Sequence, residues 1–403
     1  MLSITEALEE VSRHAFRLPT LECPAIEAMG MALAEDVISP VESPAFDKAM
    51  MDGFALIAAD TNSGNVNLEI VEEITAGNTA SEAIEEGQAA RIMTGAPLPP
   101  GADSVIMVED TQIDSENVDR VQILQPVKQG SHVLKQGDLL AKGQVVIPTG
   151  TIIRPVEVGI LADLAAGKAL VHRRPTVAII CTGDELVGPG VEPGPGQIRN
   201  TNGPMLEAMA IEAGATVKQL GIVRDNRDEL AQAIKEGLQA DILLISGGMS
   251  VGVKDLGPAL LAQQGVEKIF HKVKLKPGKP LWFGKQADTD IPTLVFGLPG
   301  NPASSLVCFH VFVRRALNEL MGRSQISPFV SGFLLTRDFV NPGNRPVFFP
   351  AYASRKDGGG ATIVPLNWKG SADIATLSQA NALACFEANS QYEAGQFVSA
   401  VMT

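Results

Sequence analysis

The chain has 403 residues, with 32 lysines and arginines against 46 aspartates and glutamates, and 45% of its residues are hydrophobic. This length predicts several domains, each with its own core, because one domain usually spans about 100–200 residues. The net charge of −14 excludes a nucleic-acid backbone as the main partner. A local cluster of lysines can still bind a small anion.

The cysteines and the N-terminus indicate the compartment. Cys23, Cys181, Cys308 and Cys385 are widely separated and form no Cys-x-x-Cys pair, so neither a zinc knuckle nor a disulfide framework is expected. The start of the chain lacks the basic flank and apolar run of a signal peptide. No uncharged apolar run reaches the ~20 residues of a membrane helix. We therefore expect a cytoplasmic protein with no membrane or nucleic-acid partner.

The first part of the chain predicts a helix followed by a mostly β module. Ser3 and Glu6 form a capping box that opens an amphipathic helix over residues 3–15. Short β segments separated by turns fill residues 44–133, which is typical of a compact β module. Another helix is expected over residues 155–164.

From Pro175 onward, strands and helices alternate, which predicts a parallel sheet with helices on both faces. After Gly322 the pattern is β again, and the remaining residues suffice for one small sandwich or barrel. The alternating elements are strand 176–180, helix 203–213, strand 216–222, helix 227–239, strand 241–245, helix 256–264, strands 266–274 and 293–297, and helix 302–320.

Four of these strands end in loops with acidic or small residues. Parallel strands end at one sheet edge, so we expect the loops to converge there. Each acid alone could be an ordinary helix cap, but clustered carboxylates repel one another unless a cation such as Mg²⁺ neutralises them. The loop residues are Asp184, Glu185, Asp225, Ser246, Gly247, Gly248, Ser250, Gly252, Asp255, Pro299, Gly300, Asn301, Pro302 and Ser304.

Two of these loops also predict anion binding by the backbone. Small residues after Ile245 let N–H groups approach an anion, although a glycine-rich turn without a ligand is an equal alternative. Pro302 suits the first turn of a helix. The N–H groups of Ser304 and Ser305 would then face a ligand.

A lysine-rich segment provides cations. Lys272, Lys274 and Lys276 alternate along a predicted strand and so share one face, and Lys279 follows in a turn. An edge strand protected by lysines would look similar. Acids for a metal together with lysines for anions are what phosphoryl chemistry needs. The chain has no Walker A motif, which excludes a P-loop nucleotidase.

Six short motifs follow one another along the chain. They are Met51-Asp52-Gly53, Met93-Thr94-Gly95-Ala96-Pro97, Thr182-Gly183-Asp184-Glu185-Leu186, Ser246-Gly247-Gly248-Met249-Ser250-Val251-Gly252, Lys276-Pro277-Gly278-Lys279-Pro280 and Gly297-Leu298-Pro299-Gly300-Asn301-Pro302. Alone, Asp52-Gly53 and Thr94-Gly95 in the first module would be read as turns. In this order, the six motifs resemble the molybdopterin molybdenumtransferases, the molybdenum-insertase family of bacterial MoeA and the gephyrin E domain. The resemblance covers essentially the whole chain.

The resemblance implies an elongated multidomain subunit of α/β and β parts. A doubly wound parallel-sheet domain is similar to the molybdopterin adenylyltransferases, and a mostly β module, a mixed linker domain and a C-terminal β-barrel accompany it. The implied parts are an N-terminal helix (1–19) packed on the α/β domain, the linker (20–43 and 143–170), the β module (44–142), the α/β domain (171–322) and the barrel (323–403).

The resemblance also implies the reaction. Adenylylated molybdopterin and molybdate are the substrates, Mg²⁺ is the cofactor, and AMP is released. The active site is shared between the subunits of a homodimer, and a molybdopterin adenylyltransferase is a candidate partner. Molybdate and tungstate have nearly the same size and charge, so both remain open. The resemblance implies catalytic roles for Asp52, Thr94, Glu185, Asp225 and Asp255, with Asp184 beside them. Our hypothesis from the physical chemistry is that Asp184, Asp225 and Asp255 hold the metal. The predicted substrate-binding residues are Ser246, Gly247, Gly248, Ser250, Gly252, Lys272, Lys276, Lys279, Pro299, Gly300, Asn301, Pro302 and Ser304.

The chain departs from the family pattern at several positions. Leu139 stands where relatives have an aspartate, with Asp138 one place earlier, and Cys181 replaces the usual serine. Residues 48–50 also differ from the common form. Two other functions are alternatives to molybdenum insertion: an adenylyltransferase that acts one step earlier, and a scaffold protein. The flanking β modules argue against the first, and retention of the sheet-edge acids argues against the second.

Overall fold

The computed structural model describes residues 1–113, 117–249, 256–287, 291–324, 327–355 and 360–403. The chain forms two compact units: one holds Met1–Glu35, Thr149–Leu161 and Gly167–Thr403, and the other holds Asp36–Pro148 and Ala162–Ala166. The predicted five-part division remains a prediction. None of the helices in the described ranges is both long and apolar enough to cross a membrane.

The smaller unit is mostly β, as predicted. Its six-stranded sheet has the order β7-β4-β6-β5-β9-β8. Side chains alternate across β4, so that Ala55 enters one apolar cluster while Phe54 and Leu56 enter another on the opposite face. The elements are β2 (Val37–Ile38), β3 (Lys48–Ala49), β4 (Gly53–Leu56), η1 (Ala58–Thr61), β5 (Val66–Ile74), β6 (Gln88–Ile92), β7 (Ser104–Met107), η2 (Val108–Asp110), β8 (Thr111–Ile113), β9 (Arg120–Ile123), β10 (Val133–Leu134) and β11 (Val145–Ile147).

The larger unit contains a six-stranded sheet of order β16-β13-β17-β20-β19-β18. The first four strands are parallel, as predicted, but β19 is antiparallel to both β20 and β18. The predicted parallel sheet is thus confirmed in β16, β13, β17 and β20, whereas β19 departs from it, because the segments 272–281 and 287–293 are too short for a parallel crossover. The strands are β13 (Thr176–Thr182), β16 (Thr216–Val223), β17 (Ile242–Ser246), β18 (Val266–His271), β19 (Trp282–Gln286) and β20 (Leu294–Leu298).

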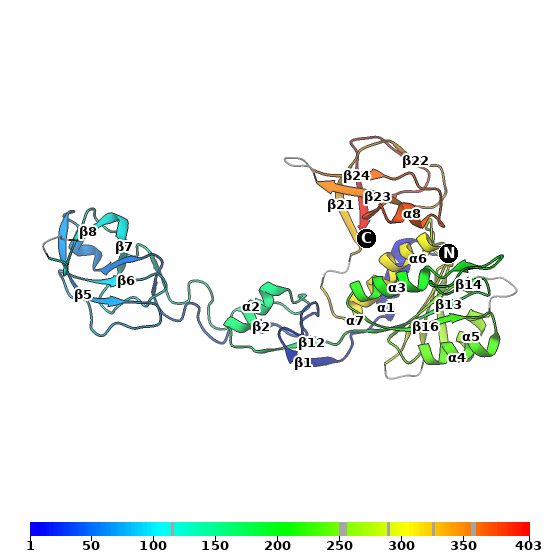
Figure 1. The fold of residues 1–403 in the computed structure, drawn as a ribbon, viewed down its shortest axis with the longest axis horizontal. Coiled ribbons are helices and arrows are strands. Elements are labelled where there is room, and N and C mark those ends of the chain that lie inside the picture. Colours follow the sequence, from blue (N-terminus) through cyan, green and yellow to red (C-terminus); the bar gives the residue numbers. More distant parts are fainter. Residues whose placement is uncertain (114–116, 250–255, 288–290, 325–326, 356–359) are drawn as a thin grey trace. The chain divides into compact units, whose positions relative to one another are not determined.

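Helices cover both faces of this sheet. Figure 1 shows α4 and α5 on one side and α1, α3, α6 and α7 on the other. The predicted capping box is confirmed, because the Ser3 side chain accepts from Glu6 N while the Glu6 carboxylate accepts from Ser3 N. The helices are α1 (Ile4–His14), α3 (Asn202–Glu212), α4 (Arg227–Gly237), α5 (Gly257–Gln263), α6 (Pro302–Cys308), a π-helical turn (Phe309–Val313) and α7 (Arg314–Leu320).

Strand β13 contributes side chains to two hydrophobic cores, one on each face of the sheet. Val177 and Ile179 face the core under α1, α3 and α7, whereas Ala178 and Ile180 face the core under α4 and α5. A strand buried on both faces needs a continuous apolar run, and this one ends at the polar Thr182. The sheet is thereby rigid up to the point where its loops begin.

An ion pair between the half-buried Arg173 and the buried Asp241 fixes the opposite edge of the sheet. Arg173 donates through Nη1 and Nη2 to Asp241 at 2.7 and 2.6 Å, and Thr176 donates to the same carboxylate through N and Oγ1. Burial favours the neutral acid, but the hydrogen bonds from Arg173 and Thr176 outweigh it and lower the pKa of Asp241.

Replacing Asp241 by asparagine is expected to lower the free energy of unfolding by about 1–3 kcal/mol, because the buried acceptor of the Arg173 and Thr176 hydrogen bonds loses its charge. Urea unfolding followed by fluorescence measures this. In the native chain, the contribution is present at neutral pH and is lost as the pH falls below about 4, because the folded-state pKa is the lower one. Glu236→Gln, which breaks the exposed pair with Lys218, is the control and should cost less than about 1 kcal/mol.

The larger unit also contains the predicted C-terminal barrel, closed by five strands in the order β21-β24-β23-β25-β27. Lys276 N donates to Pro346 O at 2.9 Å and Phe348 N donates to Lys276 O at 2.8 Å, so the barrel pairs with segment 272–281. The remaining elements are β1 (Thr20–Pro24), α2 (Pro155–Asp163), β12 (Lys168–His172), β14 (Leu186–Val187), β15 (Ile198–Arg199), β21 (Phe329–Leu335), β22 (Phe339–Asn341), β23 (Val347–Arg355), β24 (Ala361–Pro365), α8 (Ile374–Leu377), β25 (Ala382–Phe386), β26 (Ser390–Tyr392) and β27 (Phe397–Met402).

Candidate active site

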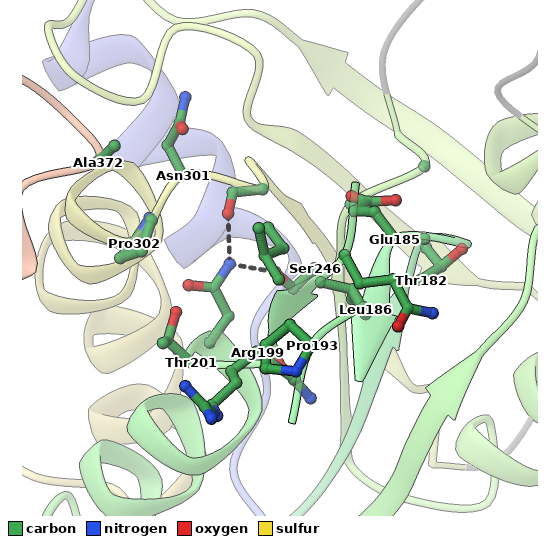
Figure 2. A pocket seen from close by; sticks show the side chains of 18 of the residues that line it. Thr182, Glu185, Leu186, Pro193, Arg199, Thr201, Ser246, Asn301, Pro302 and Ala372 are labelled. Atoms are coloured by element: carbon green, nitrogen blue, oxygen red, sulfur yellow. Dashed lines mark hydrogen bonds between the residues drawn. The ribbon is translucent and has the colours of Figure 1, made fainter. Parts of the chain in front are cut away.

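A cavity of about 830 Å³ lies at the carboxyl ends of β13, β17 and β20. Figure 2 shows Thr182, Glu185 and Ser246 on its wall, together with Asn301 from the start of α6. The predicted convergence of strand-end loops is therefore present in the described residues. The predicted residues that line this cavity are Glu185, Asp225, Ser246, Gly247, Gly248, Gly300, Asn301 and Pro302.

Asp225 is held in place by its neighbours. Thr182 Oγ1 donates to Asp225 Oδ1 at 2.6 Å, and the Asp225 backbone N–H donates to Asp184 Oδ1 at 3.2 Å. Asp184 and Asp225 are thus adjacent, and Asp225 lines the cavity. Within the described ranges, no three His, Cys, Asp or Glu side chains gather as a metal site. Asp255 of the predicted metal set lies outside the described residues, as do Ser250 and Gly252.

The backbone conformation and close packing of the loop after β17 explain why it contains Gly247 and Gly248. Gly247 and Gly248 have φ of +92° and +62°, and an added Cβ on Gly247 would collide with Thr182 O. The Gly247 N–H already donates to Leu298 O at 3.2 Å, so this amide is not available to an anion. These glycines let two strand ends approach each other, and they form the cavity wall.

The expectation for the start of α6 was wrong. Ser304 N and Ser305 N both donate to Asn301 O, at 3.0 and 3.1 Å, so neither N–H is free for a ligand. A carbonyl at the N-cap normally accepts the first helical hydrogen bonds, and Pro302 at the first position lacks an N–H. Ser304 lines a different cavity.

Asn202, at the start of α3, was not predicted as a site residue. Its Nδ2 donates to Ser246 Oγ at 2.8 Å and to Gly300 O at 2.7 Å, the dashed bonds in Figure 2. One buried side chain thereby ties together the loops after β17 and β20. The polar run Asn200-Thr201-Asn202 before an apolar helix was the available signal.

The lysine segment differs from the prediction. Strand β18 ends at His271, Lys272 has φ of +76°, and residues 272–281 form a loop, so the lysines do not share a strand face. Because β18 runs parallel to β20, the loop still lies at the carboxyl edge. Lys276 and Lys279 line a second cavity of about 570 Å³, and Lys272 lines neither cavity.

This second cavity lies between the loop and the barrel. Arg345 and Lys369 of the barrel region add two cations that the sequence did not single out. Among its described lining residues there is no Asp or Glu. A smaller cavity of about 170 Å³ adjoins both, because it shares Gly300 and Asn301 with the first and Pro280 with the second. Pro299, a predicted substrate residue, lines this smaller cavity.

Gly278 in the lysine loop has no room for a side chain. Its φ is +112°, and an added Cβ would lie 2.7 Å from the buried Cys308 Sγ. Gly278→Ala is expected to cost about 1–3 kcal/mol of stability and to weaken anion binding by shifting Lys276 and Lys279. Thermal unfolding and titration with a small inorganic oxyanion measure the two effects.

The control is Gly265→Ala, where φ is +78° and nothing lies within 4 Å of the added Cβ. This variant has the backbone strain alone and should bind the oxyanion normally. Equal oxyanion affinity in Gly278→Ala and the native chain would show that the close packing of Gly278 does not position Lys276 and Lys279.

Asp52 and Thr94 form a separate pair in the smaller unit. Asp52 Oδ1 accepts from Thr94 N at 2.6 Å and from Thr94 Oγ1 at 2.8 Å, and both residues are exposed. These hydrogen bonds lower the pKa of Asp52 and keep its carboxylate charged. The pair thus offers an oriented anionic group to solvent.

The departures from the family pattern have structural outcomes. Leu139 is 58% exposed, and Lys135 N donates to Asp138 Oδ2 at 3.0 Å within a local turn. Burial raises the pKa of the Cys181 thiol to about 11, which argues against a role as nucleophile.

Sequence identity to known proteins shows which family the chain belongs to. The chain is 32% identical over 410 residues to the molybdopterin molybdenumtransferase of Staphylococcus epidermidis, covering 100% of this chain and 96% of that protein. It is 34% identical over 377 residues to the Bacillus subtilis protein of the same name, covering 92% and 86%. The chain belongs to the molybdopterin molybdenumtransferase family. The resemblance seen in the six motifs is confirmed.

Family models and a solved structure agree with this assignment. Residues 2–165 match the MoeA N-terminal region (domain I and II), 178–319 a probable molybdopterin binding domain, and 333–402 the MoeA C-terminal region (domain IV). The crystal structure of the molybdopterin biosynthesis MoeA protein from Pyrococcus horikoshii OT3 superposes with a TM-score of 0.84 at 30% identity, covering 100% of both chains. The chain is therefore a transferase of molybdenum cofactor biosynthesis, with both cavities in its larger unit.

Proposed function

We propose that the chain inserts molybdenum from molybdate into adenylylated molybdopterin, in the presence of Mg²⁺ and with release of AMP. The observation that carries this proposal is the adjacency of an acid-lined cavity and a cation-lined cavity at one sheet edge. Molybdate and a phosphoanhydride are both anions, so bringing them together requires fixed positive charge and fixed orientation.

The cation-lined cavity is the proposed molybdate subsite. Lys276 and Lys279 from the loop and Arg345 from the barrel line it together. Arg345 is oriented by donation from Nη1 to Leu275 O at 2.9 Å. A guanidinium held in this way loses little freedom when it binds an oxyanion. Tungstate would fit the same charges.

The acid-lined cavity is the proposed nucleotide and phosphoanhydride subsite. Its donor set fits Mg²⁺, which is typically held by one or two carboxylates together with substrate phosphates and water. Asp184 and Asp225 would hold the ion, with Asp255 as the third predicted ligand. When bound, Mg²⁺ neutralises negative charge on phosphate oxygens. The hydrogen bonds from Thr182 Oγ1 and the Asp225 N–H hold the carboxylates of Asp225 and Asp184 in place. The Asn202 side chain fixes the loops around them.

We propose further that the active unit is a homodimer in which Asp52 and Thr94 of one subunit complete the cleft of the other. The exposed, charged Asp52 carboxylate and the exposed face of α2 support this. Helix α2 is mostly apolar, yet its Val156 is 64% exposed, and an apolar helix face is normally covered. The adenylyltransferase that makes the substrate is the proposed partner, and the cytoplasm is the proposed compartment.

Complementation tests the shared site. Asp52→Ala and Asp225→Ala are each expected to be nearly inactive, whereas the mixed dimer of the two variants should regain about half of native activity, because one of its two sites is intact. Coexpression of differently tagged variants and assay of the purified mixed dimer measure this. A mixed dimer as inactive as its parents would contradict the shared site.

A nucleotide assay separates insertion from adenylylation. With ATP and free molybdopterin, the chain should release no pyrophosphate, whereas with adenylylated molybdopterin and molybdate it should release AMP. Pyrophosphate release from ATP would indicate the earlier reaction and contradict the proposal.

A further inference from the structure

The second cavity has an aromatic wall as well as a cationic one. Phe349 and Trp368 line it from the barrel region, and Lys276 and Lys279 line it from the loop. A small inorganic oxyanion needs only the cations, and a cavity of about 570 Å³ exceeds what it would fill. A ligand that fills this cavity would therefore also have an apolar or aromatic group in contact with Phe349 and Trp368.

The aromatic side chains form a supported stack. Phe339 stacks on Phe386 with ring centroids 3.8 Å apart, and it meets Phe349 edge to face at 4.9 Å. Phe349 in turn meets Trp368 at 5.4 Å with an interplanar angle of 89°. Such a cluster holds its outermost ring in a fixed position. Trp368, the outermost ring, is half-buried and lines the cavity.

The loop that carries Trp368 is fixed by hydrogen bonds on the C-terminal side of this residue. Asp373 accepts from Lys369 N at 3.1 Å and from Thr376 N at 3.1 Å, and Ser371 O accepts from Ala303 N at 3.1 Å. The indole Nε1 of Trp368 is buried without a hydrogen-bond partner in the described part of the chain. The ring is thus positioned by packing and not by its own polar group.

We propose that Trp368 is the platform on which the pterin ring of the substrate stacks, beside the oxyanion held by Lys276, Lys279 and Arg345. This inference rests on the proposed function. A flat, neutral nitrogen heterocycle that carries an anionic group matches one aromatic wall and one cationic wall. The substrate has two flat heterocycles, and the acid-lined cavity is the proposed subsite of the adenylate. The pterin is therefore assigned to the aromatic wall.

The test titrates the full chain with pterin-6-carboxylate by calorimetry. Trp368→Leu should weaken binding about tenfold or more, whereas Trp368→Phe, which keeps an aromatic face, should stay within about threefold of the native chain. Phe397→Leu removes a 69% exposed aromatic ring elsewhere on the barrel and should change nothing. Molybdate affinity should be unchanged in Trp368→Leu, because the cations remain.

Fluorescence gives a second readout. Trp282 and Trp368 are the two tryptophans of the chain, and Trp282 is buried in the sheet. Pterin-6-carboxylate should quench the indole emission of the native chain but not that of Trp368→Phe. Persistent quenching in Trp368→Phe, native affinity in Trp368→Leu, or loss of AMP affinity instead of pterin affinity would each overturn the assignment.

This inference and the proposed function fail separately. Native pterin affinity in Trp368→Leu, with normal AMP release, would overturn only the role of Trp368. Absence of molybdate-dependent AMP release in the native chain would overturn the proposed function, whereas loss of pterin binding in Trp368→Leu would still support the stacking platform.

Discussion

Asp225→Asn is expected to lower the rate of molybdenum insertion about 100- to 1,000-fold, the usual cost of removing a charged group that acts directly on the reacting centre. The asparagine keeps the shape of the side chain and can still accept from Thr182 Oγ1, so the loop should remain folded. What it loses is the negative charge that would hold the cation beside the phosphoanhydride. The rate of AMP release at saturating substrate measures the effect.

The control for this variant is Asp228→Asn. Asp228 is an exposed acid in the first turn of α4, three residues further along the chain and outside the cavity lining. It should keep the native rate. Equal rates for Asp225→Asn and the native chain would show that the cavity acid has no part in the reaction.

Lys279→Ala is expected to raise the molybdate concentration needed for half-maximal rate about tenfold or more, and Lys276→Ala should act in the same direction. The described lining of this cavity contains no carboxylate, so each cation attracts the oxyanion directly. Each substitution removes one of these cations and thereby weakens oxyanion binding. The maximal rate should change less than the half-saturating concentration, because these side chains bind the oxyanion in the ground state. Steady-state titration with molybdate separates the two parameters.

Lys274→Ala provides a matched control within the same loop. Lys274 is exposed and lies two residues before Lys276, but it does not line the cavity. Its removal should leave molybdate dependence unchanged. If Lys274→Ala and Lys279→Ala raised the half-saturating concentration equally, general surface charge, and not the cavity, would be responsible.

Sequence periodicity predicted most of the elements that build the site. The alternation of apolar strands and amphipathic helices after Pro175 placed β13, β16, β17 and β20, and the Ser3/Glu6 pair placed the start of α1. These signals are local, because each depends on residues within a few turns of one another. The convergence of Glu185, Asp225 and Ser246 followed from topology alone.

The errors arose where pairing across the chain decides structure. Alternating lysines look like a strand, but β18 ends at His271 and the positive φ of Lys272 turns the chain. The Ser304 and Ser305 amides were expected to be free, yet Asn301 O accepts from both. Local patterns carry no information on which carbonyl captures an N–H group.

The residues that were missed belong to the barrel or to the start of α3. Arg345 and Trp368 reach the second cavity because the barrel pairs with segment 272–281 through Lys276 and Phe348. No spacing in the sequence relates a barrel loop to the lysine turn about 70 residues earlier. Only the tertiary structure shows that the barrel and the lysine turn together build the cation-lined cavity.

The most direct measurement is AMP release from adenylylated molybdopterin by the purified chain, with and without molybdate, in the presence of Mg²⁺. We expect one AMP per molybdenum inserted, with release dependent on molybdate and about 100- to 1,000-fold slower in Asp225→Asn. AMP release at the same rate without molybdate, or molybdenum insertion without AMP release, would contradict the coupling of the two cavities on which the proposed function rests.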